Sequence, residues 1–266
     1  MHRPTISCTS SGRHSQNMIH RRSPTRFKWL VILVTVMAIA VAVAVMVIVF
    51  THRTDLPTFT ATEKSPAISP VGVMASSFGS GVTTLSVNPQ HSGDVLVVMA
   101  ESDYSAVRVV SMAGGSVRVW VPALQRVGTG EPHAYSIWYG TVAAPGPSTI
   151  AFEWSGPITG DNAEYEAQEF SGGAGWYLDG AGSLDNPAST IVSFPSLIPS
   201  NEGDLYFAYA DYGTSPASGG PGGYTYIITP DHNQIAYGVR VEEPPRSLLP
   251  SAAPSTTVAV LLASVS

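Results

Sequence analysis

The chain has 266 residues and a formal net charge of −6, with 13 Lys and Arg against 19 Asp and Glu. This balance argues against a nucleic acid partner, because phosphates are repelled by an acidic surface. The single cysteine, Cys8, cannot form a disulfide within the chain, so any folded domain must be held together by its own hydrophobic core.

Residues 1–28 are rich in Ser, Thr, Arg and His. A segment with so few apolar residues cannot bury enough surface to offset the entropy of ordering, so we expect a disordered tail. Met18 is an alternative start of the protein.

Residues 29–50, WLVILVTVMAIAVAVAVMVIVF, contain no charge, proline or glycine. A helix of this length crosses a hydrocarbon core of about 30 Å. Six basic residues and no acidic residue precede the run, so the positive-inside rule predicts a cytoplasmic N-terminus and an extracytoplasmic C-terminal region in the cell membrane. A cleaved signal peptide is the alternative, but its apolar region spans only about 7 to 15 residues and is followed by an A-x-A-like site.

Residues 51–70, THRTDLPTFTATEKSPAISP, have the Thr, Ser and Pro content of an extended stalk. After residue 50, seven basic residues stand against 19 acidic ones, so the exterior region carries a formal charge of about −12.

Residues 71–266 alternate between short runs rich in Val, Ile, Tyr, Phe and Thr and clusters of turn residues, which is typical of an all-β domain. We predict a single antiparallel β-sandwich. The expected strands are 71–78, 81–87, 94–101, 106–112, 116–121, 134–143, 148–155, 164–170, 189–194, 204–211, 224–229, 233–241 and 256–265.

One local pattern is written twice in this domain. GDVLVVMAESD at 93–103 and GDLYFAYADYG at 203–213 each follow a turn cluster, and each begins an apolar strand that ends in an acid, Glu101 or Asp211. We expect equivalent strands in two halves of the domain. No fixed period of 20 to 50 residues recurs, which excludes a solenoid or propeller.

Two local predictions follow from turn residues. Residues 107–120 are expected to form a hairpin around Ala113-Gly114-Gly115, with Arg108 stacked on Trp120. Residues 242–255 contain four prolines, so we expect irregular backbone there, followed by a closing C-terminal strand.

The order of these signals resembles jelly-roll-like sandwich domains of bacterial surface proteins and phage tail structural proteins. The segments that carry the resemblance are Gly93–Val97, Gly115–Trp120, Ile137–Gly140, Gly146–Phe152 and Gln168–Gly172. The resemblance implies a display or adhesion module and brings no catalytic set with it. The excess of Arg over Lys, eleven to two, is typical of a GC-rich bacterial genome.

Motifs for chemistry are absent from the sequence. It contains no H-x-x-x-H pair, G-x-S-x-G elbow, P-loop or cysteine nucleophile in the exterior region, so we name no catalytic residue. A hydrolase is the alternative, and it would require His91, His133 or His232 to meet a serine and a carboxylate.

Acidic side chains cluster in loops, where calcium finds oxygen ligands. Asp161, Asn162 and Glu164 form the candidate calcium site, and the alternative is a solvated acidic loop. The two other clusters are Glu101 with Asp103 and Asp179 with Asp185-Asn186.

Aromatic residues in glycine-rich segments are candidate ligand contacts. Trp176 and Tyr177 lie in an expected loop at 171–189, and Tyr212 and Tyr224 flank another at 213–223. Such rings stack on sugars or partners, or instead cap the core. We therefore expect a membrane-anchored display or adhesion module that binds an envelope glycan or protein; a structural spacer is a further alternative.

Overall fold

The computed structural model describes residues 67–103, 106–128, 132–158, 162–200, 203–212, 219–220, 222–239 and 243–265. The chain divides into two compact units, residues 1–62 and 63–266, and every described residue belongs to the second. The predicted tail, membrane span and most of the stalk lie outside the described residues. Within the described part, no helix is long and apolar enough to cross a membrane. All its regular elements are strands and all their pairings are antiparallel, so the all-β prediction is confirmed.

The central sheet has five strands in the order β1 (Ser69–Ser80), β8 (Asn162–Ser171), β3 (Val95–Ser102), β6 (Ala134–Thr141) and β5 (Val121–Val127). Every residue of β3, the middle strand, is buried. Its side chains alternate between two separate cores, with Val97 in one and Val98 in the other. The central sheet is therefore covered on both faces.

The small sheet covers one face and contains β2 (Thr84–Val87), β7 (Ser148–Trp154) and β4 (Val109–Gly114) in that order. Ile150 and Phe152 of β7 are buried against the central sheet while their neighbours are exposed, the alternation expected of a half-buried strand.

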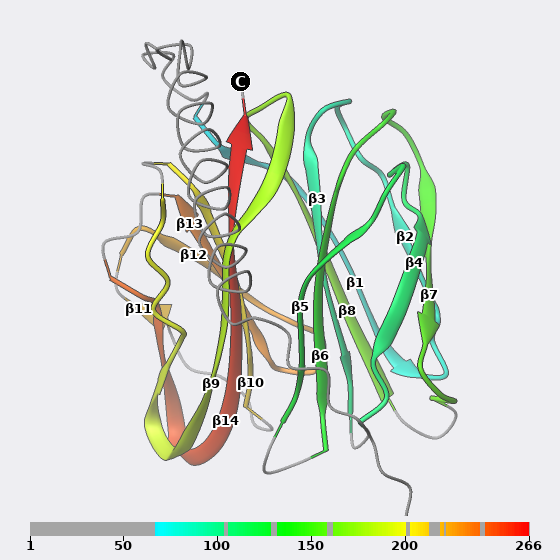
Figure 1. The fold of residues 1–266 in the computed structure, drawn as a ribbon. Coiled ribbons are helices and arrows are strands. Elements are labelled where there is room, and N and C mark those ends of the chain that lie inside the picture. The colour runs from blue at the N-terminus through cyan, green and yellow to red at the C-terminus, as the bar shows by residue number, and fades with distance from the viewer. Residues whose placement is uncertain are drawn as a thin grey trace, which may run out of the picture. The chain divides into compact units, whose positions relative to one another are not determined.

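The C-terminal sheet covers the other face, so the three sheets form three layers (Figure 1). Its strands are β11 (Gly219–Gly220), β14 (Arg246–Val265), β10 (Leu205–Asp211), β13 (Gln234–Val239) and β12 (Tyr224–Ile228), and β9 (Gly175–Ser193) also pairs with β14. Leu205, Phe207 and Tyr209 of β10 share a core with alternate residues of β3.

The long β9–β14 ladder shifts register between Leu248 and Ser255, near Pro250 and Pro254. Proline is tolerated at such bulges because no ladder hydrogen bond needs its missing N–H. Past this point, Val192 and Leu249 pack in a third core with Tyr206. The prediction of irregular backbone was therefore wrong from Arg246 onward.

The N-terminal half, β1–β8, and the C-terminal half, β9–β14, have the same strand order. In the N-terminal half, the five-stranded order is β1-β8-β3-β6-β5 and the three-stranded order is β2-β7-β4. In the C-terminal half, the five-stranded order is β9-β14-β10-β13-β12. Its three-stranded order consists of the later part of β9, the early part of β14, and β11. Taken along the chain, each strand of one half has a counterpart in the other. The repeated Gly-Asp pattern does mark equivalent strands, β3 and β10, but each is the middle of its own five-stranded order.

The strand registers support this equivalence. Gly140 lies opposite Leu96, the second residue of β3, and Gly238 lies opposite Tyr206, the second residue of β10. A Cβ at either glycine would come within 2.8 Å of a carbonyl oxygen, of Val119 in one case and Gly223 in the other. The sequences Ile137-Trp138-Tyr139-Gly140 and Ile235-Ala236-Tyr237-Gly238 are thus a second repeat, which sequence reasoning missed.

The predicted hairpin at residues 107–120 does not form. Among the described strands, β4 pairs with β7 and not with residues 116–120, so Val109 lies opposite Trp154. The Trp120 indole donates instead to the carbonyl oxygen of Gly114 at 3.1 Å. Residues 116–120 form only a single bridge, between Val117 and Val142, and β5 begins at Val121, so the strand predicted at 116–121 was also wrong.

Candidate functional site

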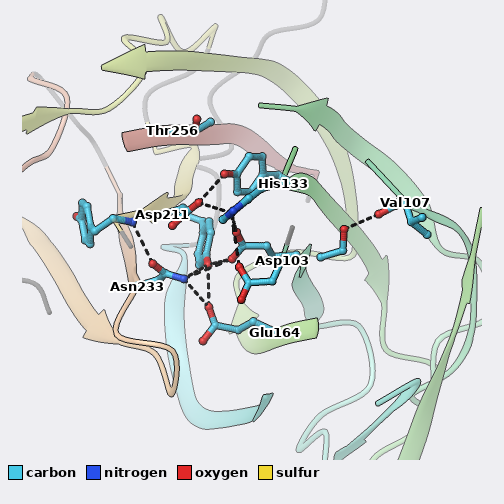
Figure 2. Close-up of polar contacts among 12 residues, drawn as sticks. Asp103, Val107, His133, Glu164, Asp211, Asn233 and Thr256 are labelled. Carbon is cyan, nitrogen blue, oxygen red and sulfur yellow. Dashed lines mark hydrogen bonds and ion pairs between the residues drawn. The ribbon is translucent and has the colours of Figure 1, made fainter. Parts of the chain in front are cut away.

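The acids that end the two repeated strands meet at one histidine. His133 Nδ1 lies 2.8 Å from Asp211 Oδ2, 3.1 Å from Glu101 Oε1 and 3.6 Å from Asp103 Oδ1 (Figure 2). Glu101 comes from the end of β3 and Asp211 from the end of β10. All four side chains are buried. We call this group, with the residues that hydrogen-bond to it, the polar network.

Each half supplies a hydrogen-bond donor to the terminal acid of the other half. The Tyr135 hydroxyl of β6 donates to Asp211 Oδ2 at 2.6 Å. Asn233, just before β13, donates from Nδ2 to Glu101 Oε2 at 3.4 Å and to Glu164 Oε2 at 3.2 Å. Tyr135 and Asn233 are equivalent positions, each two residues before the repeated isoleucine. The polar network therefore joins the halves reciprocally.

Tyr209 lies between two carboxyl groups of this network. Its hydroxyl contacts Glu101 Oε2 and lies 2.7 Å from Glu164 Oε2, while Asn233 Nδ2 donates to it at 2.6 Å. A phenol has one proton to donate, so the second carboxyl must itself be protonated to form its bond. Burial, together with the charge of Asp211, raises the pKa of Glu101 well above its ordinary value. We therefore place the proton on Glu101.

His133 and Asp211 form an ion pair within the network. Burial lowers the pKa of His133, but its hydrogen bonds to Asp211 and Glu101 outweigh this and raise the pKa to about 10. Burial raises the pKa of Asp211, but the hydrogen bonds from His133 and Tyr135 outweigh it and leave the pKa below its ordinary value. At neutral pH the network therefore contains His133 as a cation beside the Asp211 carboxylate.

Three ligand atoms of the network could hold a metal ion only after Glu101 and His133 lose the protons assigned to them above, because a metal ligand must be deprotonated. Glu101, Asp103 and His133 each offer one such atom within 4.8 Å of the others. Of the predicted calcium site, Asp161 lies outside the described residues, Asn162 hydrogen-bonds to Asp103, and Glu164 lies in the network. Two of the predicted acidic clusters meet because Glu101 and Glu164 are paired across β3 and β8.

The third acidic cluster lies apart from this network. Asp185 forms an ion pair with Arg126, and Asp179 accepts a hydrogen bond from the backbone N–H of Ser200. Calcium binding stays a prediction.

The histidines do not assemble a serine triad in the described part of the chain. The ion-pair contacts of His133 go to carboxylates, His91 Nδ1 lies 3.3 Å from Asp94, and His232 occupies a turn with a φ of 62°. His133 and Asp211 are both buried.

A cleft of about 500 Å³ opens near the starts of β3 and β9, at the opposite end of β3 from Glu101. Residues from both halves line it, among them Ser92, Arg118, Tyr139, Thr141, Ala174 and Trp176. The Trp176 indole N–H donates to the carbonyl oxygen of Gly93 at 3.1 Å, which fixes the ring. Sequence reasoning identified Trp176 but missed Arg118 and Tyr139.

The four aromatic residues predicted to bind a ligand do not come together. The expected loop at 171–189 is wrong, because most of it belongs to strand β9. Successive residues of a strand face opposite sides, and Trp176 lines the cleft whereas Tyr177 does not. Tyr212 is 2% exposed and donates to Gln234, so it belongs to the core.

Tyr224 lies on β12, which is separated from β9 by three strands, β14, β10 and β13. Its hydroxyl donates to the carbonyl oxygen of Glu243, and its ring packs on Tyr206. Trp176 is therefore the one predicted aromatic contact that lines the cleft. No family model, curated protein or solved structure matches the chain.

Proposed function

We propose that this chain is a single-pass membrane protein whose extracytoplasmic region, residues 71–266, displays a recognition domain that binds an envelope glycan. In this proposal each half is a jelly-roll-like sandwich. The strand orders support the assignment, since positions one, eight, three and six share one sheet and positions two, seven and four share the other in both halves.

The observation that carries the proposal is the cleft between the halves. Trp176 is half-buried, and its N–H is used by Gly93, so the ring can offer its flat apolar surface to a ligand. Flat rings stack on the apolar faces of sugars, while nearby hydroxyls such as that of Thr141 can exchange hydrogen bonds with sugar hydroxyls. This combination of groups favours a saccharide over a purely apolar ligand.

Retention on immobilised envelope polysaccharides and cell-wall material tests the proposal. The full chain, solubilised in a mild detergent, should be retained on at least one of these materials, and Trp176→Ala should abolish retention. Tyr177→Ala is the matched control, because it removes an exposed aromatic ring from the same strand outside the cleft.

Trp176→Phe checks that any loss does not come from misfolding, since it keeps a flat ring in place and should keep most of the binding. Absence of retention on every material would overturn glycan recognition. Equal loss in the Trp176→Ala and Tyr177→Ala variants would remove the cleft as its site.

A further inference from the structure

The cleft contains an unusual charge for this protein. Residues 67–266 contain no lysine and only five arginines against 17 Asp and Glu. Among the described residues that line the cleft, Arg118 is the one charged side chain, and no carboxylate accompanies it. An acidic domain has therefore placed one of its few cations where a ligand would enter.

Arg118 is exposed, and no carboxylate in the described part of the chain forms an ion pair with it. Among the described residues, Arg126 is paired with Asp185 at 2.5 Å, whereas Arg118 takes part in no ion pair. Arg108 and Arg246 also lack an ion pair among the described residues, but of these three arginines Arg118 alone lines the cleft. Its position in the cleft leaves the guanidinium available to a ligand.

The segment that carries Arg118 is held by hydrogen bonds on both sides of it. Ala143 donates from its backbone N–H to the Ser116 carbonyl oxygen at 2.7 Å, and Val117 forms a bridge with Val142. Trp120 is tied to Gly114 through its indole N–H. The backbone under the guanidinium is thus preorganised, which reduces the entropy lost on binding.

We propose that the cleft binds an acidic saccharide, with the guanidinium of Arg118 holding a carboxylate of the ligand while Trp176 stacks on a sugar ring. This inference rests on the proposed glycan recognition and adds the class of ligand. A guanidinium fork binds a carboxylate through two parallel hydrogen bonds, which gives both energy and orientation. Trp176 and Arg118 come from different halves, so the ligand bridges them.

Two probes with one backbone test this proposal by titration calorimetry on the full chain in detergent. One is a uronic acid oligosaccharide from the material that retains the protein, and the other is the same oligosaccharide with its carboxyl groups reduced to alcohols. The unmodified protein should bind the acidic probe at least about tenfold more tightly than the reduced one. The preference should shrink as salt is added, because an exposed charge is screened.

Arg118→Gln should erase this preference by weakening binding of the acidic probe alone. Arg118→Lys should restore only part of it, since an ammonium lacks the planar fork. Arg108→Gln is the matched control: it also removes one exposed positive charge, but outside the cleft. An equal loss in Arg108→Gln would show a general charge effect and would overturn the inference.

The failures of the two proposals are distinguishable. Binding of both probes with equal affinity, lost in Trp176→Ala, would leave glycan recognition standing and remove the acidic ligand. Preference for a phosphorylated form of the same oligosaccharide over the uronic acid form would overturn the carboxylate assignment. Retention on no acidic polysaccharide, with retention on neutral ones, would do the same.

Discussion

The interface between the central and C-terminal sheets is closed at one end and open at the other. At the ends of β3 and β10, acids of both halves are buried around His133 and hydrogen-bonded across the interface. At the starts of β3 and β9, the same interface opens into a cleft with one exposed cation. At the closed end, replacing one of these groups leaves its buried partner without a hydrogen bond, so we expect a single substitution there to destabilise the protein. At the open end, Trp176 and Tyr139 pack on the core, whereas Arg118 is exposed, so we expect changes at Arg118 to affect binding more than stability.

Removal of the last ten residues, 257–266, should have the largest effect on stability, because β14 extends from the closed end of the interface to the open end. Its residues pair with both β10 and β9, from Thr257 beside the polar network to Val265 beside the cleft. We expect the truncated chain to lose cooperative unfolding in a urea titration followed by tryptophan fluorescence. A cooperative transition at the original midpoint would show that β14 is dispensable.

Asp211→Ala should come next, because it leaves the His133 cation buried without its nearest carboxylate. Breaking a buried ion pair from one side costs about 3 to 5 kcal/mol, and the Tyr135 hydroxyl also loses its acceptor. Urea unfolding at pH 7 measures this loss. A loss below about 1 kcal/mol would mean that the polar network does not hold the halves together.

Glu166→Gln should stabilise the protein at neutral pH. Glu166 is fully buried, neither of its oxygens has a hydrogen-bond partner, and burial raises its pKa to about 9, with a further contribution from Glu164. The folded state holds the proton more tightly than the unfolded state, so stability is greatest below pH 4.5 and falls as pH rises from 4.5 to 9. The variant removes that fall, a gain of up to about 3 kcal/mol at pH 7.

Urea titrations of both proteins between pH 4.5 and 9 check the sign of this effect. The two proteins should be equally stable near pH 4.5, and the difference between them should grow as pH rises. Both should also lose the same additional amount of stability over this range. That shared loss arises because the raised pKa of His133 makes its contribution complete below pH 6.5 and lost by about pH 10. An advantage of the variant that did not grow with pH would contradict the assignment.

Arg118→Gln should change stability least, by less than about 0.5 kcal/mol, as is usual for an exposed residue without structural contacts. The same urea titration at pH 7 measures it, with Arg126→Gln for comparison because Arg126 has an ion pair to lose. A large loss in Arg118→Gln would give the cleft a structural role and weaken the contrast between the two ends.

The strand pattern could be predicted from the sequence because alternation and turn residues act locally. β3, β6, β7 and β10 lie within a residue or two of their expected positions. β9 could not be predicted, since its Gly-rich and Pro-containing sequence suits a loop, and the β14 ladder beside it supplies the hydrogen bonds that make it a strand. The same long-range pairing turned residues 246–255 into a strand.

The candidate site could be predicted only in part from the sequence, because it too depends on long-range contacts. The acids at the ends of the repeated strands were visible in the sequence, and a strict alignment of the two repeats could have shown that Glu101 and Asp211 are equivalent. Their meeting at His133 depends on the packing of one sheet on another, which no local pattern encodes. Arg118 had no signal at all, since one exposed arginine in a loop is ordinary until its neighbours are known.

Because the polar network joins residues of both halves, it cannot form until most of the chain has been synthesised. Glu101 must await Asn233, which the ribosome adds 132 residues later (233 minus 101). At about 5 to 20 residues per second this delay is roughly 7 to 26 s. Throughout it, the face of β3 that carries Val95, Val97 and Met99 has no C-terminal sheet to cover it. We therefore expect the first half to expose this apolar face, a surface prone to aggregation, until the second half is made.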